Sequence, residues 1–376
     1  MKDLINLIMC FVNKIFYSNK KSLLRYLLYF FIKGFIRFSQ NNVFFTKILQ
    51  KTYKCFFDFP KLLYIHPHKA CNLKCIYCYE KGKKIKENLS FNDYIRIFEQ
   101  AEKLGISSVH ILGGEPFLYK NIFKMMDFLN KKDFSVHIYT NGSILNKNLI
   151  KRLTKYKNLS ILFSLEPKEV YKKICGKDFF NKVIENYNEC NKNNISTGIL
   201  FTLNKINFPY IESFFANTIS KYNMNLISER FLPVGNLKID NACEISSKEW
   251  NVFLKILKKY NKKNYFIPFS DITPVFRGFG CNDFYESIHI NSDGYVSPCE
   301  YVMNKIKIGN IRNNSLEIIW NKYKMYRLKW LKKSVECHNC KFANFCGGGC
   351  KAYCFLKTGK FDIKDPLCNL KQTPFA

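Results

Sequence analysis

The sequence predicts an α/β fold in which helices cover a parallel sheet. Six short runs rich in β-branched and aliphatic residues alternate along the chain with segments that have the spacing of amphipathic helices. This alternation is typical of parallel strands joined by right-handed helical crossovers. A chain of 376 residues is long enough to bury the core of such a sheet and to carry a further small domain.

The first three predicted strands are separated by two helices. A strand at about 61–66 comes first. Ser90 begins the next helix, Asp93 completes a capping box with it, and Gly105 ends the helix. The run SSVHI is the second strand, a helix over about 120–131 follows, and FSVHIYT is the third strand.

Three further strands follow, each preceded by a helix. In order, these elements are a helix near 146–156, the strand LSILFSLE, a helix over about 178–193, the strand STGILFTLN, a helix from Pro209 and the strand NLISERFLP. Sheets of this class carry their functional residues at the carboxyl ends of the strands. The residues that follow each run are therefore the candidates for a site.

Cysteines, glycines and polar residues follow four of these strands. They are a cysteine loop after the first strand, Gly113, Gly114, Glu115 and Pro116 after the second, Thr140, Asn141 and Gly142 after the third, and Ser164 and Glu166 at the end of the fourth. Because the carboxyl ends of parallel strands meet at one edge of a sheet, we expect these residues to lie together.

The cysteine loop carries Cys71, Cys75 and Cys78 in the spacing Cys-x-x-x-Cys-x-x-Cys. A 4Fe–4S cluster has four irons, so three thiolates leave one iron open to a small molecule. Tyr77 is placed to pack beside that molecule. The alternatives are a zinc site or a structural group of thiols, since zinc also accepts thiolate ligands.

Taken with the motifs after the later strands, the loop resembles that of the radical S-adenosylmethionine (SAM) enzymes. The resemblance implies that the open iron binds the amino and carboxylate groups of SAM. An electron from a donor such as flavodoxin or ferredoxin then cleaves SAM to methionine and a 5′-deoxyadenosyl radical, which abstracts hydrogen from the substrate. The fold implied is a partial (β/α)6 TIM-like barrel.

The resemblance also assigns the SAM contacts. Gly113, Gly114, Glu115 and Pro116 match the motif that receives the SAM amino group, and the two glycines allow a close backbone approach. Glu115 would pair with the ammonium or brace the loop. Ser164 matches a residue that contacts ribose or carboxylate. The remaining expected contacts are Tyr77, Asn141 and Glu166.

The chain departs from the family pattern at two places. Ser164-Leu165-Glu166-Pro167 stands where the family often has Ser-Leu-Asp-Gly, and Cys175-Gly176 stands where many members have an Arg-Gly pair. The arginine of that pair contacts the SAM carboxylate. The candidates to replace its charge are Lys172, Lys173 and Lys177. Lysine is a point charge without the bidentate fork of arginine, and Cys175 itself reads best as a small buried side chain.

The carboxyl-terminal third contains a second set of spaced cysteines. Cys281 is followed by twelve residues, Gly294, four residues and Cys299, and four more cysteines have the spacing Cys-x-x-Cys-x5-Cys-x3-Cys before a last one at 368. This order resembles the SPASM domain, which is named for subtilosin, quinone-cofactor, sulfatase and mycofactocin maturation. Ser292-Asp293-Gly294 also predicts a hairpin turn between IHIN and YVSP.

The SPASM resemblance implies two auxiliary iron–sulfur clusters. Cluster I would be held by Cys281, Cys299 and Cys350, and cluster II by Cys337, Cys340, Cys346 and Cys368. This division leaves cluster I one protein ligand short. The candidates for the missing ligand are Asp283, Glu286, His289 and Cys354, unless that iron stays open to substrate. The alternative for the whole array is two zinc ribbons.

Glu300 directly follows Cys299 and is the candidate catalytic base. In relatives that mature sulfatases, an aspartate at the corresponding place acts as a base during oxidation. A glutamate would do the same if burial raised its pKa. The alternative is a carboxylate at the edge of the hairpin with no chemical role.

Composition indicates the compartment and the partners. Most of the 16 cysteines cluster at metal-ligand spacings in a long chain, which favours a reducing cytoplasm over a secreted disulfide framework. The formal net charge of +31 favours an acidic peptide or anionic lipid as partner. No segment resembles a nucleic-acid-binding module, so no nucleic acid is expected.

The first 60 residues contain eight Lys and two Arg against two Asp, among aliphatic and aromatic runs. No uncharged apolar run reaches the roughly 18 residues of a spanning helix, and there is no secretory cleavage site. We expect basic amphipathic helices in residues 1–55, which either lie on an anionic membrane surface or dock on the barrel. The enzyme would then be cytoplasmic, free or peripheral on the inner face of the membrane.

The sequence therefore divides into four parts. They are a helical extension (1–58), a radical SAM core (59–240), a linker with a helix (241–280) and a cysteine-rich SPASM lobe (281–376) that closes the open side of the barrel. We expect an enzyme that matures a ribosomal peptide or protein. The alternatives are radical modification of a lipid or sugar precursor at the membrane surface, and a zinc-held binding module without catalysis.

Overall fold

The fold is taken from a computed structural model that describes residues 60–80, 88–234, 242–260, 286–330, 334–340 and 348–368. The predicted amino-terminal helices, most of the predicted linker, Cys281, Asp283 and Cys346 lie outside these residues. None of the helices in the described ranges has the length and apolar character needed to cross a membrane.

One nine-stranded sheet organises the described residues, in the order β6-β5-β4-β3-β2-β1-β7-β8-β9. All neighbours from β6 to β7 pair in parallel, and the last two pairs are antiparallel. The strands are Leu62–Ile65 (β1), Ser108–Ile111 (β2), Ser135–Thr140 (β3), Leu159–Ser164 (β4), Ser196–Leu203 (β5), Leu226–Arg230 (β6), Ser287–Ile290 (β7), Tyr295–Ser297 (β8) and Gly309–Asn310 (β9).

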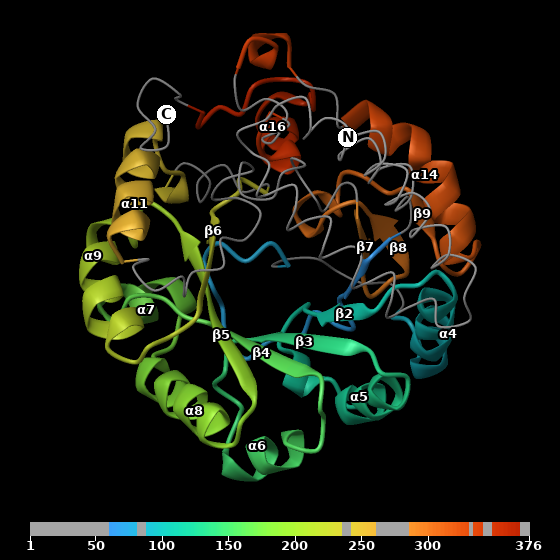
Figure 1. The fold of residues 1–376 in the computed structure, drawn as a ribbon, viewed down its shortest axis with the longest axis horizontal. Coiled ribbons are helices and arrows are strands. Elements are labelled where there is room, and N and C mark those ends of the chain that lie inside the picture. Colours follow the sequence, from blue (N-terminus) through green and yellow to red (C-terminus); the bar gives the residue numbers. More distant parts are fainter. Residues whose placement is uncertain are drawn as a thin grey trace, which may run out of the picture.

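Helices form a ring around the curved sheet (Figure 1). In chain order they are α4 (Phe91–Lys103), α5 (Ile122–Lys131), α6 (Lys147–Leu153), α7 (Lys168–Cys175), α8 (Phe180–Lys192), α9 (Ile211–Phe214), α11 (Ser247–Tyr260), α14 (Leu316–Trp330) and α16 (Lys351–Thr358). The carboxyl-terminal helices α14 and α16 fill the arc between α11 and α4, where the barrel would otherwise be open. The predicted α/β fold with a partial barrel is confirmed.

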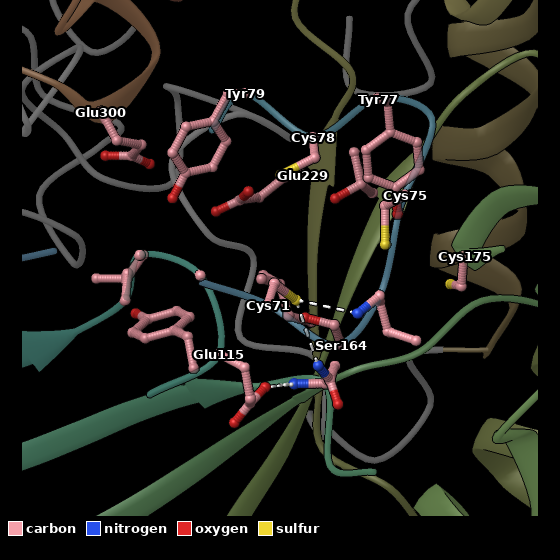
Figure 2. Close-up of a pocket in the computed structure, with 18 of the residues that line it drawn as sticks. Cys71, Cys75, Tyr77, Cys78, Tyr79, Glu115, Ser164, Cys175, Glu229 and Glu300 are labelled. Carbon is pink, nitrogen blue, oxygen red and sulfur yellow. Dashed lines mark hydrogen bonds between the residues drawn. The ribbon is translucent and has the colours of Figure 1, made fainter. Parts of the chain in front are cut away.

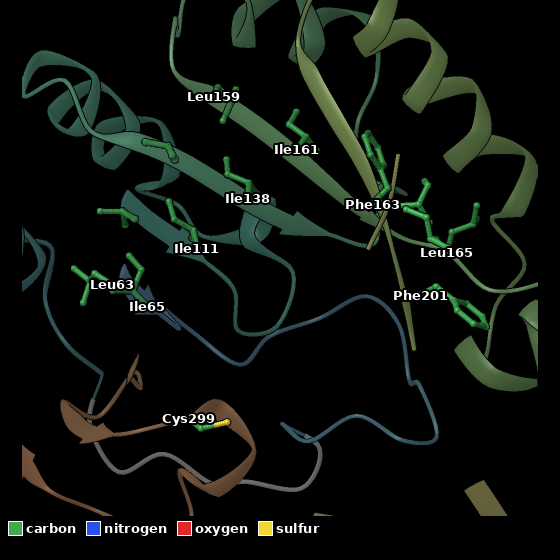
Figure 3. Close-up of a cluster of buried hydrophobic side chains, with 14 of the residues drawn as sticks. Leu63, Ile65, Ile111, Ile138, Leu159, Ile161, Phe163, Leu165, Phe201 and Cys299 are labelled. Carbon is green, nitrogen blue, oxygen red and sulfur yellow. The ribbon is translucent and has the colours of Figure 1, made fainter. Parts of the chain in front are cut away.

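Each inner strand presents one apolar face to these helices. Leu63, Ile65, Ile111, Ile138 and Ile161 have no exposed surface and belong to one continuous core (Figure 3). Because side chains alternate along a strand, the residues between them point into the barrel. The interior is therefore lined by a different set of side chains from those that build the core.

That interior holds a stack of four rings across neighbouring strands. His137, His110, Tyr64 and His289 occupy matching register positions on β3, β2, β1 and β7. Their ring centroids are 4.5 Å, 4.3 Å and 4.3 Å apart along that series. Stacked rings contribute about 0.5–1.5 kcal/mol per pair beyond their burial, so this ring stack helps to fix the strand register.

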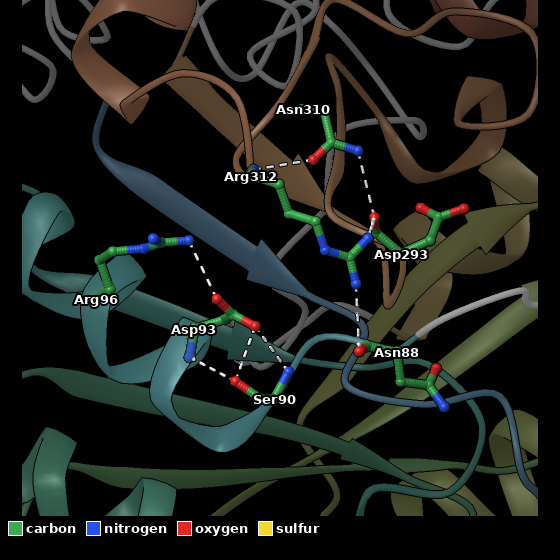
Figure 4. A network of polar contacts seen from close by, with 7 residues as sticks. All are labelled: Asn88, Ser90, Asp93, Arg96, Asp293, Asn310 and Arg312. Carbon is green, nitrogen blue, oxygen red and sulfur yellow. Dashed lines mark hydrogen bonds and ion pairs between the residues drawn. The ribbon is translucent and has the colours of Figure 1, made fainter.

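The helix α4 begins as predicted. The Ser90 hydroxyl accepts the backbone N–H of Asp93, and the Asp93 carboxylate accepts the backbone N–H of Ser90, which is a complete capping box (Figure 4). The helix ends at Lys103, and Gly105 follows with a φ of +80°. Such a φ strains residues that have a Cβ atom, which explains the glycine.

Two other helices differ from the prediction. The segment from Pro209 is divided into a 3-10 turn (Phe208–Tyr210), the short α9 and a π-helical turn (Phe215–Ser220). The helix α7 was not predicted, because only eight residues separate Pro167 from Gly176. Its end is marked by Gly176, which has a φ of +81° in the left-handed region.

The predicted hairpin is present as β7 and β8, with Gly294 in the turn at a φ of +86°. Arg312 holds this turn against the segment before α4, since its guanidinium donates to the carbonyl oxygens of Asp293 (2.8 Å) and Asn88 (3.3 Å) (Figure 4). The strand β7 pairs in parallel with β1. The carboxyl-terminal segment therefore extends the barrel sheet itself.

Candidate functional site

A pocket opens at the carboxyl ends of the barrel strands. Eleven of the predicted site residues line it: Cys71, Cys75, Tyr77, Cys78, Gly113, Gly114, Glu115, Asn141, Ser164, Glu166 and Glu300. Pro116 is buried in the turn behind them and is not part of the lining. In Figure 2, Glu300 and Cys175 lie on opposite sides, with Cys75 and Cys78 between them.

Backbone hydrogen bonds hold the cysteine loop from two sides. The N–H groups of Lys74 and Ile76 donate to the carbonyl oxygens of Cys175 (3.2 Å) and Ile174 (2.9 Å) at the end of α7. On the other side, the N–H of Gly114 donates to the carbonyl oxygen of His68 at 2.9 Å. The short helix missed by the sequence analysis thus supports the loop.

The two glycines after β2 allow this close approach. A Cβ atom on Gly114 would lie 2.0 Å from the carbonyl oxygen of Ala70, and one on Gly113 would lie 2.5 Å from that of His68. Real Cβ atoms do not come so near to a backbone oxygen. The glycines are therefore required by contact with the cysteine loop, whatever they contact in a ligand.

The three loop thiols line one pocket, and none of them forms a disulfide. Burial is the main cause that raises the pKa of Cys78 to about 11. Three thiolates at one pocket suit a 4Fe–4S cluster, because each would bind one iron and the fourth iron would stay open.

Glu115 braces the pocket wall. Its side chain is fully buried and accepts hydrogen bonds from the Thr140 hydroxyl (2.7 Å), the Asn141 N–H (2.9 Å) and the Phe117 N–H (3.3 Å). Burial is the dominant effect and raises its pKa. Of the two roles expected for Glu115, the contacts favour bracing of the loop.

Tyr77 faces the pocket, but its hydroxyl is already engaged. It donates to one carboxylate oxygen of Glu166, while the Asn207 side-chain amide donates to the other at 2.7 Å. Burial raises the pKa of Glu166 to about 7. Glu166 therefore orients Tyr77, a role that its position in the sequence did not reveal.

Cys175 is buried, as expected, and lines the pocket beside the cysteine loop. Lys172, Lys173 and Lys177 are exposed and do not line it. None of the described lining residues is a lysine, arginine or histidine. The three candidate lysines therefore do not belong to the described wall of the pocket.

Glu300 reaches the pocket from the carboxyl-terminal segment. Its carboxylate lies 3.0 Å from Nδ1 of His289, a side chain with no exposed surface. Burial raises the pKa of Glu300, but the neighbouring His289 outweighs it, and the pKa falls below its usual value. The role of Glu300 as a base was conditional on a raised pKa, and the direction is the opposite.

Glu229 and Tyr301 also line the pocket, although neither was among the predicted site residues. Glu229 on β6 accepts a hydrogen bond from the Tyr301 hydroxyl at 2.6 Å, and both side chains line the pocket. Glu229 stands at the carboxyl end of the sixth strand, so the rule that located the other residues would have found it. Tyr301 has no comparable signal in the sequence.

The described candidates for the missing ligand of cluster I all have protein partners. His289 lies beside Glu300, Glu286 is 3.7 Å from the Lys61 ammonium, and the Cys354 thiol lies 3.7 Å from the carbonyl oxygen of Ile363. Each of them would have to leave this partner to bind the cluster, whereas an iron that is open to substrate requires no such change.

Five cysteines of the SPASM pattern are described: Cys299, Cys337, Cys340, Cys350 and Cys368. Burial raises the pKa of Cys368, and the Cys337 and Cys340 thiols add to this effect. These three are therefore neighbours, which supports the grouping expected for cluster II.

Two family models match the chain. Residues 65–216 match the radical SAM superfamily, and residues 281–341 match the SPASM iron–sulfur cluster-binding domain. The first match covers the barrel up to α9, and the second covers the hairpin and the first cysteines of the carboxyl-terminal set.

Several known proteins are similar to the chain. A probable GTP 3′,8-cyclase of Saccharolobus solfataricus is 27% identical over 256 residues, which cover 62% of this chain and 80% of that protein. The subtilosin biosynthesis protein AlbA of Bacillus subtilis is 24% identical over 302 residues, 76% of this chain and 65% of AlbA. The structure of Streptococcus suis SuiB bound to precursor peptide SuiA has a TM-score of 0.69 at 21% identity and covers 86% of this chain and 81% of that one.

The match to the radical SAM superfamily covers the cysteine loop, and the SPASM match covers the first four cysteines of the carboxyl-terminal set. These matches indicate an enzyme and not a zinc-held binding module without catalysis. The cofactors are therefore a SAM-binding 4Fe–4S cluster, auxiliary clusters and SAM. The chain belongs to the radical SAM enzymes and carries a carboxyl-terminal SPASM domain.

Proposed function

We propose that this enzyme matures a ribosomally made peptide or protein. The observation that carries the proposal is the shared pocket: the cysteine loop forms one wall, and Glu300 and Tyr301 of the carboxyl-terminal segment form another. A residue inserted there would meet the radical chemistry and the SPASM segment at once. The proposed division of the chain is a radical core over 59–240 and an auxiliary-cluster domain over 281–376.

The named relatives support this substrate class. SuiB is known in complex with a precursor peptide, and AlbA takes part in the biosynthesis of a bacteriocin. The probable GTP 3′,8-cyclase shows that similar barrels also serve other substrates. We favour a peptide because both peptide-related proteins align with more than three quarters of this chain, whereas the cyclase aligns with 62%.

The proposed roles follow from the contacts in the pocket. Cys71, Cys75 and Cys78 would hold the cluster that, together with SAM, supplies the 5′-deoxyadenosyl radical. The glycine-rich turn and Ser164 would contact SAM. After losing a hydrogen atom to the radical, the substrate residue would give up one electron, for which a bound auxiliary cluster would be the acceptor, and one proton. Glu300, whose lowered pKa keeps it ionised beside His289, would accept that proton, although it is then a weaker base than a glutamate with a raised pKa.

The test uses anaerobically purified enzyme with a reductant and SAM. Candidate peptides encoded next to the gene are added, and mass spectrometry follows both 5′-deoxyadenosine and the mass of the peptide. We expect a loss of hydrogen or a changed stereocentre in one peptide. Cleavage of SAM with no change in any neighbouring peptide, and a modified lipid or sugar precursor in its place, would overturn the proposal.

The alternative substrate is a lipid or sugar precursor at the inner face of the membrane. One observation favours it, namely the ten basic residues among aliphatic and aromatic runs in residues 1–60. This segment lies outside the described residues, so the alternative depends on the sequence and is tested by membrane binding.

A further inference from the structure

A buried ion pair joins the last barrel strand to the carboxyl-terminal segment. Arg230 ends β6, and its guanidinium donates two hydrogen bonds to the Asp365 carboxylate, from Nη1 to Oδ1 at 3.1 Å and from Nη2 to Oδ2 at 2.7 Å. The two side chains are 2% and 9% exposed. The Tyr353 ring covers the guanidinium, with 4.3 Å from Cζ to the ring centroid.

Stability alone does not account for this pair. Burying two charges costs several kcal/mol of desolvation per ion, and well-packed apolar residues often replace such pairs without loss. A bidentate arginine pair does, however, fix geometry, because both donors and both acceptors are set in one plane.

Asp365 fixes the backbone at two cysteine-bearing turns. Its Oδ2 accepts the N–H of Cys350 at 3.0 Å, its Oδ1 accepts the N–H of Leu367 at 2.9 Å, and its carbonyl oxygen accepts the N–H of Cys368 at 2.8 Å. Each carboxylate oxygen thus accepts one N–H from these turns and one from Arg230. In the assignment given above, Cys350 belongs to cluster I and Cys368 to cluster II.

The chain before Cys350 is shaped to allow this contact. Gly349 has a φ of +90°, and a Cβ atom there would lie 2.3 Å from Cβ of Asp365. Both the backbone conformation and the lack of space require glycine. The Asp365 side chain therefore packs directly against the turn that carries Cys350.

The strand that carries Arg230 also reaches the pocket, through the residue before it. Glu229 precedes Arg230 on β6, and neighbouring residues of a strand point to opposite faces. Glu229 lines the pocket and accepts the Tyr301 hydroxyl, whereas Arg230 holds Asp365. Two consecutive residues of one strand thus contact the substrate side and the cysteine side of the carboxyl-terminal segment.

We propose that Arg230 and Asp365 are a positioning pair that sets both auxiliary clusters at a fixed place relative to the radical pocket. The inference rests on the proposed assignment of Cys350 and Cys368 as ligands. The pair touches neither substrate nor SAM, and it acts through the two cysteine-bearing turns. Polar groups around the ligands of a metal centre typically affect its affinity by 10–100-fold.

The test uses the full chain with Cys71, Cys75 and Cys78 replaced by alanine, so that all bound iron belongs to the auxiliary clusters. In this parent, Asp365→Asn removes the charge and places an NH2 group where one carboxylate oxygen was. This group cannot accept a hydrogen bond. We expect it to lose at least about half of the parent's iron and to change the electron paramagnetic resonance spectrum of the reduced protein. Arg230→Lys keeps the positive charge but loses the two parallel donors of the guanidinium. We therefore expect this variant to keep the iron and to change the spectrum.

Asn186→Ala is the control. The buried Asn186 amide donates hydrogen bonds to the carbonyl oxygens of Gly142 and Leu145, both at 2.9 Å, and these contacts lie in the barrel, away from the cysteine-bearing turns of the proposed pair. We expect this variant to keep the iron and the spectrum of the parent even where its melting temperature falls. An equal loss of iron in Asn186→Ala would assign the effect to general stability and would overturn the inference.

The inference also fails if Asp365→Asn keeps all the iron and neither variant changes the spectrum. Where Asp365→Asn gives no soluble protein, the spectrum of Arg230→Lys decides alone. A parent that holds no iron at all would instead contradict the ligand assignment, which is a separate failure.

Discussion

The four carboxylates of the pocket differ in role because they differ in partners. Glu115 is saturated by a hydroxyl and two backbone N–H groups, and Glu166 is shared by Tyr77 and Asn207. Glu300 lies beside His289, and Glu229 meets a tyrosine hydroxyl. Identical side chains of one pocket thus have different contacts, which favour bracing for Glu115 and orientation of Tyr77 for Glu166.

The first prediction at this scale concerns the loop thiols. Replacing Cys71, Cys75 and Cys78 with alanine removes all the protein ligands of the SAM cluster, so the variant should lose about four irons. It should produce no 5′-deoxyadenosine from SAM with dithionite as the reductant. Cys190→Ala, at a buried cysteine in α8 that does not line the pocket, is the control and should keep both properties. Unimpaired cleavage in the triple variant would contradict the assignment.

Gly114→Ala should damage the site through backbone contact alone. The added methyl group would lie 2.0 Å from the oxygen and 2.6 Å from the carbon of the Ala70 carbonyl, so the turn and the cysteine loop must separate. We expect a loss of more than about 2 kcal/mol of stability and weaker SAM binding. Gly359→Ala has no atom within 4 Å of the new methyl group and should lose only about 1–2 kcal/mol, from its φ of +73°. Equal SAM binding in Gly114→Ala and the native enzyme would refute the requirement.

At this scale, functional motifs made of residues near in sequence could be predicted, whereas contacts between residues far apart in sequence could not. The cysteine loop and the glycine-rich turn are short motifs whose spacing carries the chemistry. The Glu229–Tyr301 contact joins positions 72 residues apart, and nothing in a single sequence marks such a pair. The partner of Glu166 was hidden for the same reason.

At the scale of elements, the ring stack makes the folding stability depend on pH. Free imidazole has a pKa near 6.5, whereas burial lowers the pKa of His137 to about 4. Burial and the neighbouring imidazoles also lower the pKa of His110 well below its usual value. The unfolded chain therefore binds more protons than the folded chain below about pH 6.5. Stability should fall as the pH drops from about 6.5 to about 4, by roughly 3 kcal/mol for His137 alone.

The variant His137→Phe tests this dependence, because it keeps an aromatic ring that does not titrate. Its free energy of unfolding, measured in denaturant at pH 7.5 and pH 5, should fall about 2 kcal/mol less than that of the native protein between the two values. The difference between the two proteins cancels the contributions that they share, including those of the clusters. Identical losses in both would show that His137 is not held neutral by the fold.

Elements with long periodic patterns were predictable, and short ones were not. The six strands and the helix α4 with its capping box lie within a few residues of the expected bounds. The helix α7 spans eight residues after a proline, which is too short for a clear periodicity. Its amphipathic spacing of Val170 and Ile174, together with the left-handed Gly176, was the signal available.

At the scale of the whole molecule, the carboxyl-terminal segment completes the barrel. The strand β7 pairs with β1 across more than 220 residues of sequence, so Glu300 and Tyr301 are carried into the pocket by sheet pairing. The sequence predicted the hairpin and the closing lobe, because the turn chemistry is local. It did not predict the pairing of β7 with β1, because strand partners far apart in sequence leave no local pattern.

The last prediction concerns the basic extension and decides between the two substrate classes. The motive is the set of long aliphatic and aromatic runs that contain Lys14, Lys20, Lys21, Arg25, Lys33 and Arg37. Basic residues near an anionic membrane surface contribute on the order of 1 kcal/mol each, and apolar side chains add to this by burial in the interface. Full-length protein should therefore sediment with anionic vesicles, whereas a chain that begins near Phe56 should not.

Salt and lipid charge separate the contributions to that binding. Raising the ionic strength should weaken only the electrostatic part, and neutral vesicles should retain only the apolar part. Binding to anionic vesicles by the full-length chain alone would favour a lipid or sugar precursor as substrate, since the extension would then bring the pocket to the membrane. Equal sedimentation of both chains, or of neither, would instead favour docking of residues 1–55 on the barrel. In that case the peptide remains the better-supported substrate, because the pocket shared by the cysteine loop and Glu300 does not depend on the extension.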